Sequence, residues 1–304
     1  MAQAAESHRH LPPEWNGVVP TEVFLSEAVK IVEKSKQSGV TLRAMGGVGI
    51  ALRCPEGRDF ARRLGRMTGG PQEYTDLDFA GLLKERNKLV EFFKTLNYEK
   101  RPTTLSTSAS QRQIYYHPDG YFTVDVLMDE LLIANHPIDF RGRLRVDDLT
   151  LSLADLLLEK LQIWVSFSEK DLKDCLLLLL NHDLSDDGSD GDKINSDYIT
   201  SLLANDWGFY YTANSNLKKI LGLVGDLENS GRVVNIDASL ITAGERATIA
   251  SRIQRLLKAI EDRPKSFGWK MRAKLGTTKQ WYKTVETPAT VGDFGIWTLR
   301  DIRK

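Results

Sequence analysis

Apolar positions recur with two different periods along the chain, and the change occurs near residue 150. Before it, short apolar or alternating runs are interspersed with stretches of helical spacing. The short runs predict strands at residues 40–45, 75–79, 112–117, 121–128 and 140–146. The other stretches predict helices at 22–38, 48–53 and 83–96. After residue 150 the pattern is almost wholly helical, with helices predicted at 153–165, 172–180, 197–204, 217–227 and 243–261.

These patterns predict an α+β protein, in which a small mixed β-sheet flanked by helices is followed by a helical domain. We expect a flexible N-terminal arm at 1–20, an α/β domain at 21–150 and the helical domain at 151–304. Local signals support these elements. His117-Pro-Asp-Gly120 predicts a hairpin turn. Capping boxes are expected at Ser168 with Asp171 and at Thr242 with Glu245.

Composition indicates a soluble globular protein, because 41% of its 304 residues are hydrophobic and 27% are charged. Cys54 and Cys175 are too few to form a disulfide framework or a zinc site by themselves, which favours a reducing cytoplasm. The N-terminus lacks the apolar segment of a signal peptide, and the longest apolar run is far too short to span a bilayer. We therefore expect a cytoplasmic protein that does not enter a membrane.

The net charge is zero, but the charges are distributed unevenly. Residues 251–284 carry ten Lys or Arg against two acidic residues, and aromatic side chains lie among these cations at Phe267, Trp269, Trp281 and Tyr282. Aromatic rings stack on bases and cations bind phosphates, so this segment is a candidate for binding RNA. Packing within the helical domain is the alternative, and we favour it.

Three aspartates on predicted strands form the candidate site. In YTDLDF, at 74–79, Asp76 and Asp78 share one face of a strand because side chains alternate. Asp125 interrupts the otherwise apolar strand at 121–128, and a lone buried charge is costly unless it is paired or bound to a metal. Three neighbouring carboxylates would repel one another without a cation. They therefore predict a site for one or two Mg²⁺ ions.

A glycine pair precedes these aspartates in the chain. In MGGVGIAL, at 45–52, a predicted strand runs through Gly46 and Gly47 into a helix, which lets the backbone approach a phosphate closely. The order of strand, Gly-Gly, helix, Asp-x-Asp and third Asp resembles the nucleotidyltransferase superfamily, which includes DNA polymerase β. Within it, residues 40–180 most resemble the branch of minimal nucleotidyltransferases and abortive-infection toxins. The helical motifs LLLEKLQIW and EKDLKDCLLLLL are also similar to that branch.

The resemblance implies a Mg²⁺-dependent enzyme that moves a nucleotide from a nucleoside triphosphate such as ATP to an acceptor hydroxyl, with release of pyrophosphate. Asp76, Asp78 and Asp125 would be catalytic and would bind two Mg²⁺ ions, with Mn²⁺ as an alternative. Gly46, Gly47 and Lys160 would bind the nucleotide. The acceptor stays open between tRNA or another RNA, a small hydroxylated molecule and a protein. The resemblance to abortive-infection toxins leaves open whether an antitoxin partner exists.

Two departures from the superfamily pattern favour a second hypothesis. Gly47 stands where many members have serine, and Gln72, Glu73 and Tyr74 precede the Asp-x-Asp where relatives carry a basic residue. The alternative is a non-catalytic protein of the same fold that binds a nucleotide or a protein partner.

Overall fold

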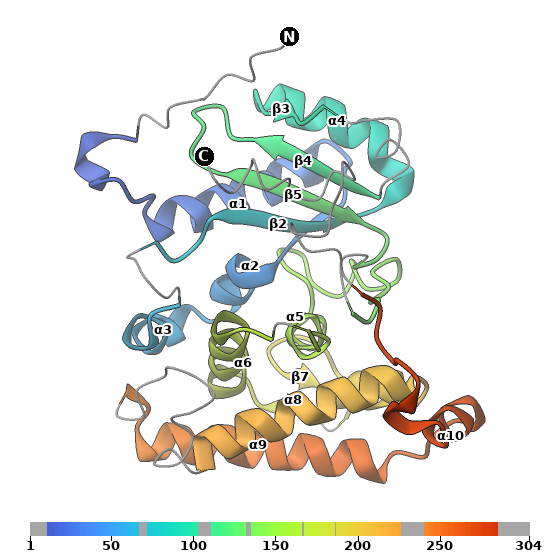
Figure 1. The fold of residues 1–304 in the computed structure, drawn as a ribbon. Helices are drawn as coiled ribbons and strands as arrows, with labels where there is room; N and C mark the ends of the chain where they lie inside the picture. The colour runs from blue at the N-terminus through green and yellow to red at the C-terminus, as the bar shows by residue number, and fades with distance from the viewer. Residues whose placement is uncertain are drawn as a thin grey trace.

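A computed structural model describes residues 11–66, 72–102, 111–131, 135–165, 167–185, 187–225 and 240–284. Its centre is a five-stranded mixed sheet in the order β1-β2-β5-β4-β3, with helices on both faces (Figure 1). The strands of the sheet are β1 (Leu42–Met45), β2 (Asp76–Gly81), β3 (Glu99–Lys100), β4 (Arg112–Tyr116) and β5 (Thr123–Met128). A separate pair consists of β6 (Leu184–Ser185) and β7 (Ile194–Asn195).

The helices fall into two groups along the chain. The first group belongs to the half that contains the sheet: α1 (Thr21–Gln37), α2 (Gly46–Arg53), α3 (Arg58–Leu64) and α4 (Arg86–Thr95). The second group forms the helical half: α5 (Leu153–Leu161), α6 (Glu169–Asn181), α7 (Ser196–Leu203), α8 (Trp207–Gly225), α9 (Ala243–Asp262) and α10 (Phe267–Ala273). Among the described residues, no helix is long and apolar enough to cross a membrane.

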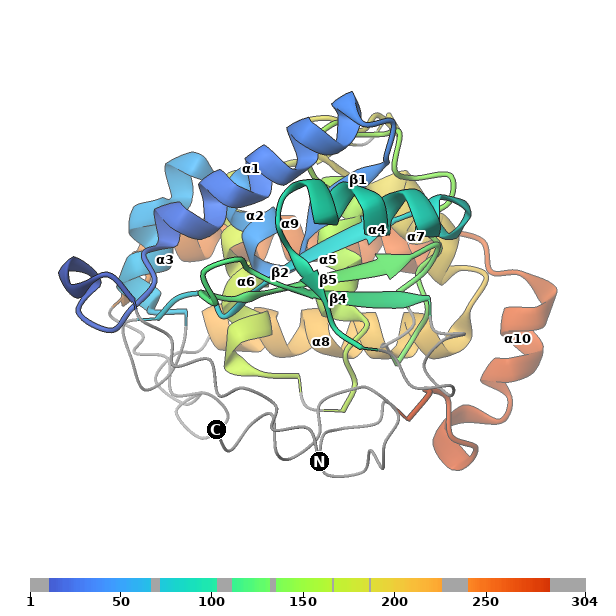
Figure 2. The ribbon, with the colours of Figure 1, turned by 90° about the horizontal axis from the view of Figure 1, so that it is seen from above.

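One face of the sheet is covered by α1 and α4, which lie over it in Figure 2. Alternation along β2 and β5 points apolar side chains toward these helices. Each of these side chains is fully buried, and none carries a charge. The buried cluster includes Leu77, Phe79, Val124 and Val126 from the sheet, Phe24, Ile31 and Val32 from α1, and Leu89, Phe92 and Phe93 from α4.

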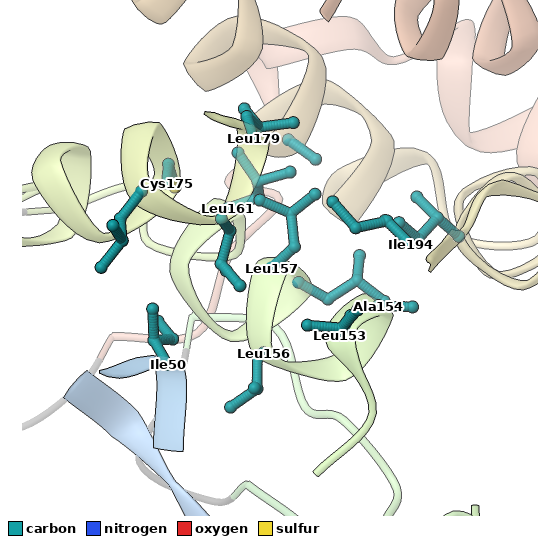
Figure 3. Packing of buried hydrophobic residues seen from close by; sticks show 14 of the residues in the cluster. Ile50, Leu153, Ala154, Leu156, Leu157, Leu161, Cys175, Leu179 and Ile194 are labelled. Carbon is teal, nitrogen blue, oxygen red and sulfur yellow. The ribbon is translucent and has the colours of Figure 1, made fainter. Parts of the chain in front are cut away.

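The opposite face looks toward α2, α5 and α6, which lie between the sheet and the long helices α8 and α9 (Figure 1). Leucines of α5 and α6 pack there with Ile50 of α2, as Figure 3 shows. The chain enters α5 beside the sheet, because residues 149–151 run along β1: Ala44 N–H donates to Leu149 O and Leu151 N–H donates to Ala44 O, both at 2.9 Å. This connection places α5 next to the face of the sheet that is opposite α1 and α4.

The predicted fold class is confirmed: a small mixed sheet flanked by helices is followed by a helical region. Four predicted strands correspond to β1, β2, β4 and β5, and both capping boxes are present. The strand expected at 140–146 is wrong. Successive turns occupy this segment, with Arg143 N–H donating to Phe140 O at 2.8 Å and Val146 N–H donating to Arg143 O at 3.0 Å. Phe140 and Leu144 are buried at a spacing of four, which suits turns rather than a strand.

Aromatic residues of the C-terminal segment pack against the helical half. Trp281 lies 4.8 Å from Trp164 and 4.9 Å from Tyr211, between ring centroids, and Trp269 lies 5.1 Å from Tyr210. These contacts agree with the packing interpretation. Residues 1–10 of the expected N-terminal arm and residues 285–304 of the expected helical domain lie outside the described residues.

Candidate active site

The three predicted aspartates lie together on one face of the sheet. Strands β2 and β5 are parallel neighbours, and their register places Asp78 directly beside Asp125 and Asp76 beside Thr123. Since residues in register on adjacent strands point to the same side, Asp76, Asp78 and Asp125 all face the helical half. The intervening Leu77 has no exposed surface and belongs to the opposite, apolar face.

Asp78 is the carboxylate of this group that lacks a direct partner. Among the residues that the structure describes, its carboxylate has no hydrogen-bond or ion-pair partner. Burial raises its pKa well above the ordinary value, and the negative charges of Asp76, Asp125 and Glu159 raise it further, while Lys160 opposes them. A carboxylate in this state gains stability from a bound cation or a bound proton.

Gly46 lies against the Asp78 carboxylate. It has a φ of +65°, which favours glycine, and a Cβ atom at this position would lie 2.5 Å from Asp78 Oδ2. The Gly46 N–H donates a hydrogen bond of 3.0 Å to Glu159 Oε2 from α5. The amide expected to bind a phosphate is therefore bonded to a carboxylate in this structure. The phosphate-binding role of Gly46 and Gly47 stays a prediction.

The Arg66 guanidinium covers Gly47, and a Cβ at residue 47 would overlap it. Arg66 donates from Nε and Nη2 to the two oxygens of Asp174 on α6, at 2.9 and 3.0 Å, and from Nη1 to Glu73 O at 2.9 Å. It also lies over the Tyr74 ring, 4.9 Å from the centroid. Glycine at position 47 makes room for this guanidinium. Arg66 therefore brings a positive charge next to residues 72–74, which contain no basic residue themselves.

Lys160 lies inside a network of carboxylates. Its side chain is 7% exposed, and its Nζ is 3.2 Å from Asp174, 3.5 Å from Asp171 and 3.5 Å from Glu159. Burial alone would lower the Lys160 pKa, but these three carboxylates outweigh it and raise the pKa. Lys160 is therefore a charged lysine whose partners are protein carboxylates. Whether it also contacts a nucleotide remains a prediction.

Asp125 is bound by an arginine from the next strand. Arg112 of β4 donates from Nε to both carboxylate oxygens, at 2.9 and 2.7 Å, and from Nη2 to Oδ2. Burial raises the Asp125 pKa, and the Arg112 guanidinium acts against that rise. Sequence patterns did not identify Arg112, Arg66 or Glu159 as site residues. The only signal for Arg66 was its place in the basic stretch at 58–66.

The donor set suits a hard divalent cation at part of the site. Asp76 and Asp78 offer carboxylate oxygens on one face, and Asp78 has no competing partner among the described residues. Within the same part of the chain, no three His, Cys, Asp or Glu side chains are placed to bind a metal ion together. Asp125 differs from the other two because both of its oxygens are bonded to Arg112. The residues present therefore fit a cation between Asp76 and Asp78.

Comparisons with known proteins give two structural matches. A crystal structure of an H. pylori protein described as a nucleotidyltransferase matches with a TM-score of 0.36 and 11% identity, covering 80% of this chain and 97% of the other. The solution structure of the antibiotic-resistance factor ANT(2'')-Ia matches with a TM-score of 0.28 and 14% identity, covering 51% of this chain and 83% of the other.

Both matches combine a low TM-score with a low sequence identity. No protein-family model matches the sequence, and no curated protein matches it.

Proposed function

We propose that this chain is a metal-dependent nucleotidyltransferase. It would move a nucleoside monophosphate from a nucleoside triphosphate, such as ATP, to an acceptor hydroxyl and release pyrophosphate. The observation that carries the proposal is the pairing in register of Asp78 with Asp125, with Asp76 on the same face and no partner for Asp78 among the described residues. An unpaired carboxylate with a raised pKa beside two others is typical of a functional site.

The roles of the residues follow from their partners. Asp76 and Asp78 would bind Mg²⁺, or Mn²⁺, together with the triphosphate. A bound metal would neutralise the charge that develops on the phosphates. The acceptor oxygen would attack the α-phosphorus as the bond to the leaving pyrophosphate oxygen breaks, and Asp125 would accept the proton of the acceptor hydroxyl. Arg112 would hold Asp125 in position for that transfer.

A second function has one observation in its favour. The ion pair with Arg112 occupies both oxygens of Asp125, as expected for a non-catalytic protein of the same fold that binds a nucleotide without transferring it. The unpaired Asp78 favours the enzyme, because a structural remnant gains nothing from a buried carboxylate without a partner.

The proposal extends to the setting of the reaction. It places the protein in a reducing cytoplasm, as the small number of cysteines in the sequence favours. The acceptor is one of three classes: RNA including tRNA, a small hydroxylated molecule, or a protein. A toxin-like role with an antitoxin partner rests on the sequence resemblance to the abortive-infection branch.

Release of pyrophosphate tests the function directly. Purified protein is incubated with each labelled nucleoside triphosphate, Mg²⁺, and fractions of cellular RNA, protein and small molecules. Transfer of label into one fraction identifies the acceptor class. Asp78→Asn should lower the rate by roughly 10²–10³-fold, as loss of one electrostatic contributor does. Asp59→Asn, on exposed α3 with 92% of its side chain accessible, should leave the rate unchanged.

Binding of a nucleotide without pyrophosphate release, at equal strength in wild type and Asp78→Asn, would favour the non-catalytic function. A variant Asp78→Asn with full transfer activity would show that the metal-binding assignment is wrong.

A further inference from the structure

We propose that Arg112 takes the place of a second metal ion at this site. One divalent cation would bind between Asp76 and Asp78, and the Arg112 guanidinium would serve Asp125 instead of a metal. The inference rests on the proposed function, which supplies the first cation. It departs from the two ions that the sequence resemblance implies.

The position of Arg112 is set by the sheet. Strand β4 is the antiparallel neighbour of β5, with Ile114 opposite Asp125 and Arg112 opposite Leu127. Since Asp125 and Leu127 are two residues apart on β5, Arg112 shares their face and its side chain extends along the strands to reach Asp125. The two side chains are each 9% exposed. The contact is therefore a nearly buried pair within the sheet rather than a surface contact.

Arg112 reduces the negative charge that a cation on this face would have to neutralise. Asp76, Asp78 and Asp125 are three carboxylates, Arg112 pairs directly with Asp125, and Arg101 adds a weaker favourable interaction with Asp125. Glu159 lies nearby on α5 and shares Lys160 with Asp171 and Asp174. Without Arg112 the aspartates would carry three negative charges, more than one divalent ion neutralises. The guanidinium thus supplies part of the positive charge that a second ion would otherwise provide.

A second ion would also meet a fixed repulsion. Arginine stays protonated under all conditions relevant to proteins, so Arg112 cannot lose its charge to admit a metal. A divalent ion bound to Asp125 would lie within a few ångströms of the guanidinium, where charges in a protein interact by several kcal/mol. Displacing Arg112 would instead leave a buried arginine without Asp125, which is strongly unfavourable. Both routes disfavour a metal at Asp125.

Counting bound Mn²⁺ ions tests the inference without measuring activity. The full chain is titrated with Mn²⁺ and the α,β-methylene analogues of the four nucleoside triphosphates, and free Mn²⁺ is followed by electron paramagnetic resonance. We expect one protein-dependent Mn²⁺ per chain. Arg112→Gln, which keeps a hydrogen-bond donor but removes the charge, should bind two. Arg112→Lys should bind one.

Arg141→Gln is the matched control, because Arg141 also forms a fork with an aspartate, Asp139, but on the surface, where their side chains are 66% and 51% exposed. It should bind one ion, like the wild type. Two ions in the wild type, or one ion in a folded Arg112→Gln, would overturn the inference. The wild-type count decides even if Arg112→Gln fails to fold. No bound Mn²⁺ in the wild type would instead refute the proposed function itself.

Discussion

The two faces of the central sheet are both buried, but they are stabilised in different ways. The face under α1 and α4 is apolar, and its closest ring pair, Phe93 on Tyr115, stacks at 4.0 Å between centroids. The face toward the helical half carries Asp76, Asp78 and Asp125. Hydrophobic burial requires no specific partner, whereas each buried charge requires one. The comparison separates a face that maintains the fold from a face that can perform chemistry.

Several buried charges on the side of the sheet toward the helical half follow this rule. Arg112 pairs with Asp125, Arg66 with Asp174, and Lys160 with three carboxylates. Asp78 has no such partner among the described residues. The exception is informative because a group that costs stability in the free protein is expected where a ligand compensates for it.

The largest effect should come from the apolar face. Phe93→Ala removes a fully buried ring that contacts Phe92, Tyr98 and Tyr115. We expect a loss of about 3–5 kcal/mol in the free energy of unfolding, measured by urea denaturation. The transfer rate per folded molecule should stay close to that of the wild type.

Phe267→Ala is the matched control, because that ring is 79% exposed. Its cost should stay within about 0.5 kcal/mol. Equal losses for the two phenylalanines, or a lost transfer rate in folded Phe93→Ala, would contradict the division of roles between the faces.

The second effect concerns the dependence of stability on pH. The Asp78 pKa is raised in the folded protein, so protonation favours the folded state. The free energy of unfolding of the metal-free protein should therefore fall as the pH rises from 3.8 through the raised pKa of Asp78. Asp78→Asn should show a smaller fall, because it cannot ionise, and thermal unfolding at a series of pH values measures the difference.

Mg²⁺ with a nucleoside triphosphate should reduce the same pH dependence in the wild type, because a bound cation compensates for the Asp78 charge. Identical pH profiles for the wild type and Asp78→Asn would show that Asp78 is not the uncompensated charge of this face.

The smallest effect concerns the helix that carries Asp171 and Asp174. Ser168 caps α6 because its hydroxyl oxygen accepts from the Asp171 N–H, and the Asp171 carboxylate accepts from the Ser168 N–H. Ser168→Ala should lower the free energy of unfolding by about 1 kcal/mol. Ser26→Ala, an exposed serine within α1 whose hydroxyl donates to Val23 O, should change it by less than about 0.5 kcal/mol. Chemical denaturation of the two variants gives the comparison, and a larger cost for Ser26→Ala would contradict it.

Periodicity predicted most of the sheet, because apolar side chains recur at every second position on the face of β2 and β5 that packs under α1 and α4. The segment at 140–146 failed for a physical reason. Phe140 and Leu144 are buried by packing with the helical half, and a short apolar segment cannot reveal which distant element it contacts. The start of α8 at Trp207 was missed as well, since a helix buried on several sides lacks a clear polar face.

The site was predictable only in its carboxylates. Asp76 and Asp78 share a face through strand geometry alone, and Asp125 stood out as a charge in an apolar strand. The roles of Arg112 and Arg66 could not be predicted from strand alternation. Their contacts depend on which strands are neighbours in the sheet and on the direction in which a long side chain extends. At position 47 the sequence showed only that the chain lacks the hydroxyl of a serine. In the structure, the Arg66 guanidinium lies over Gly47.

The parallel pairing of β2 with β5 has a consequence for how the protein folds. Parallel neighbours need a long crossover, and here α4, β3 and β4 lie between them in the chain. Asp78 and Asp125 therefore meet only after this long-range contact forms, which is a slow class of event. Repulsion between the two carboxylates would therefore affect the late steps of folding and not the early steps. We expect Asp78→Asn to slow unfolding while leaving the folding rate nearly unchanged. Stopped-flow kinetics in urea measures both rates. Faster folding with an unchanged unfolding rate would show that the aspartates meet early.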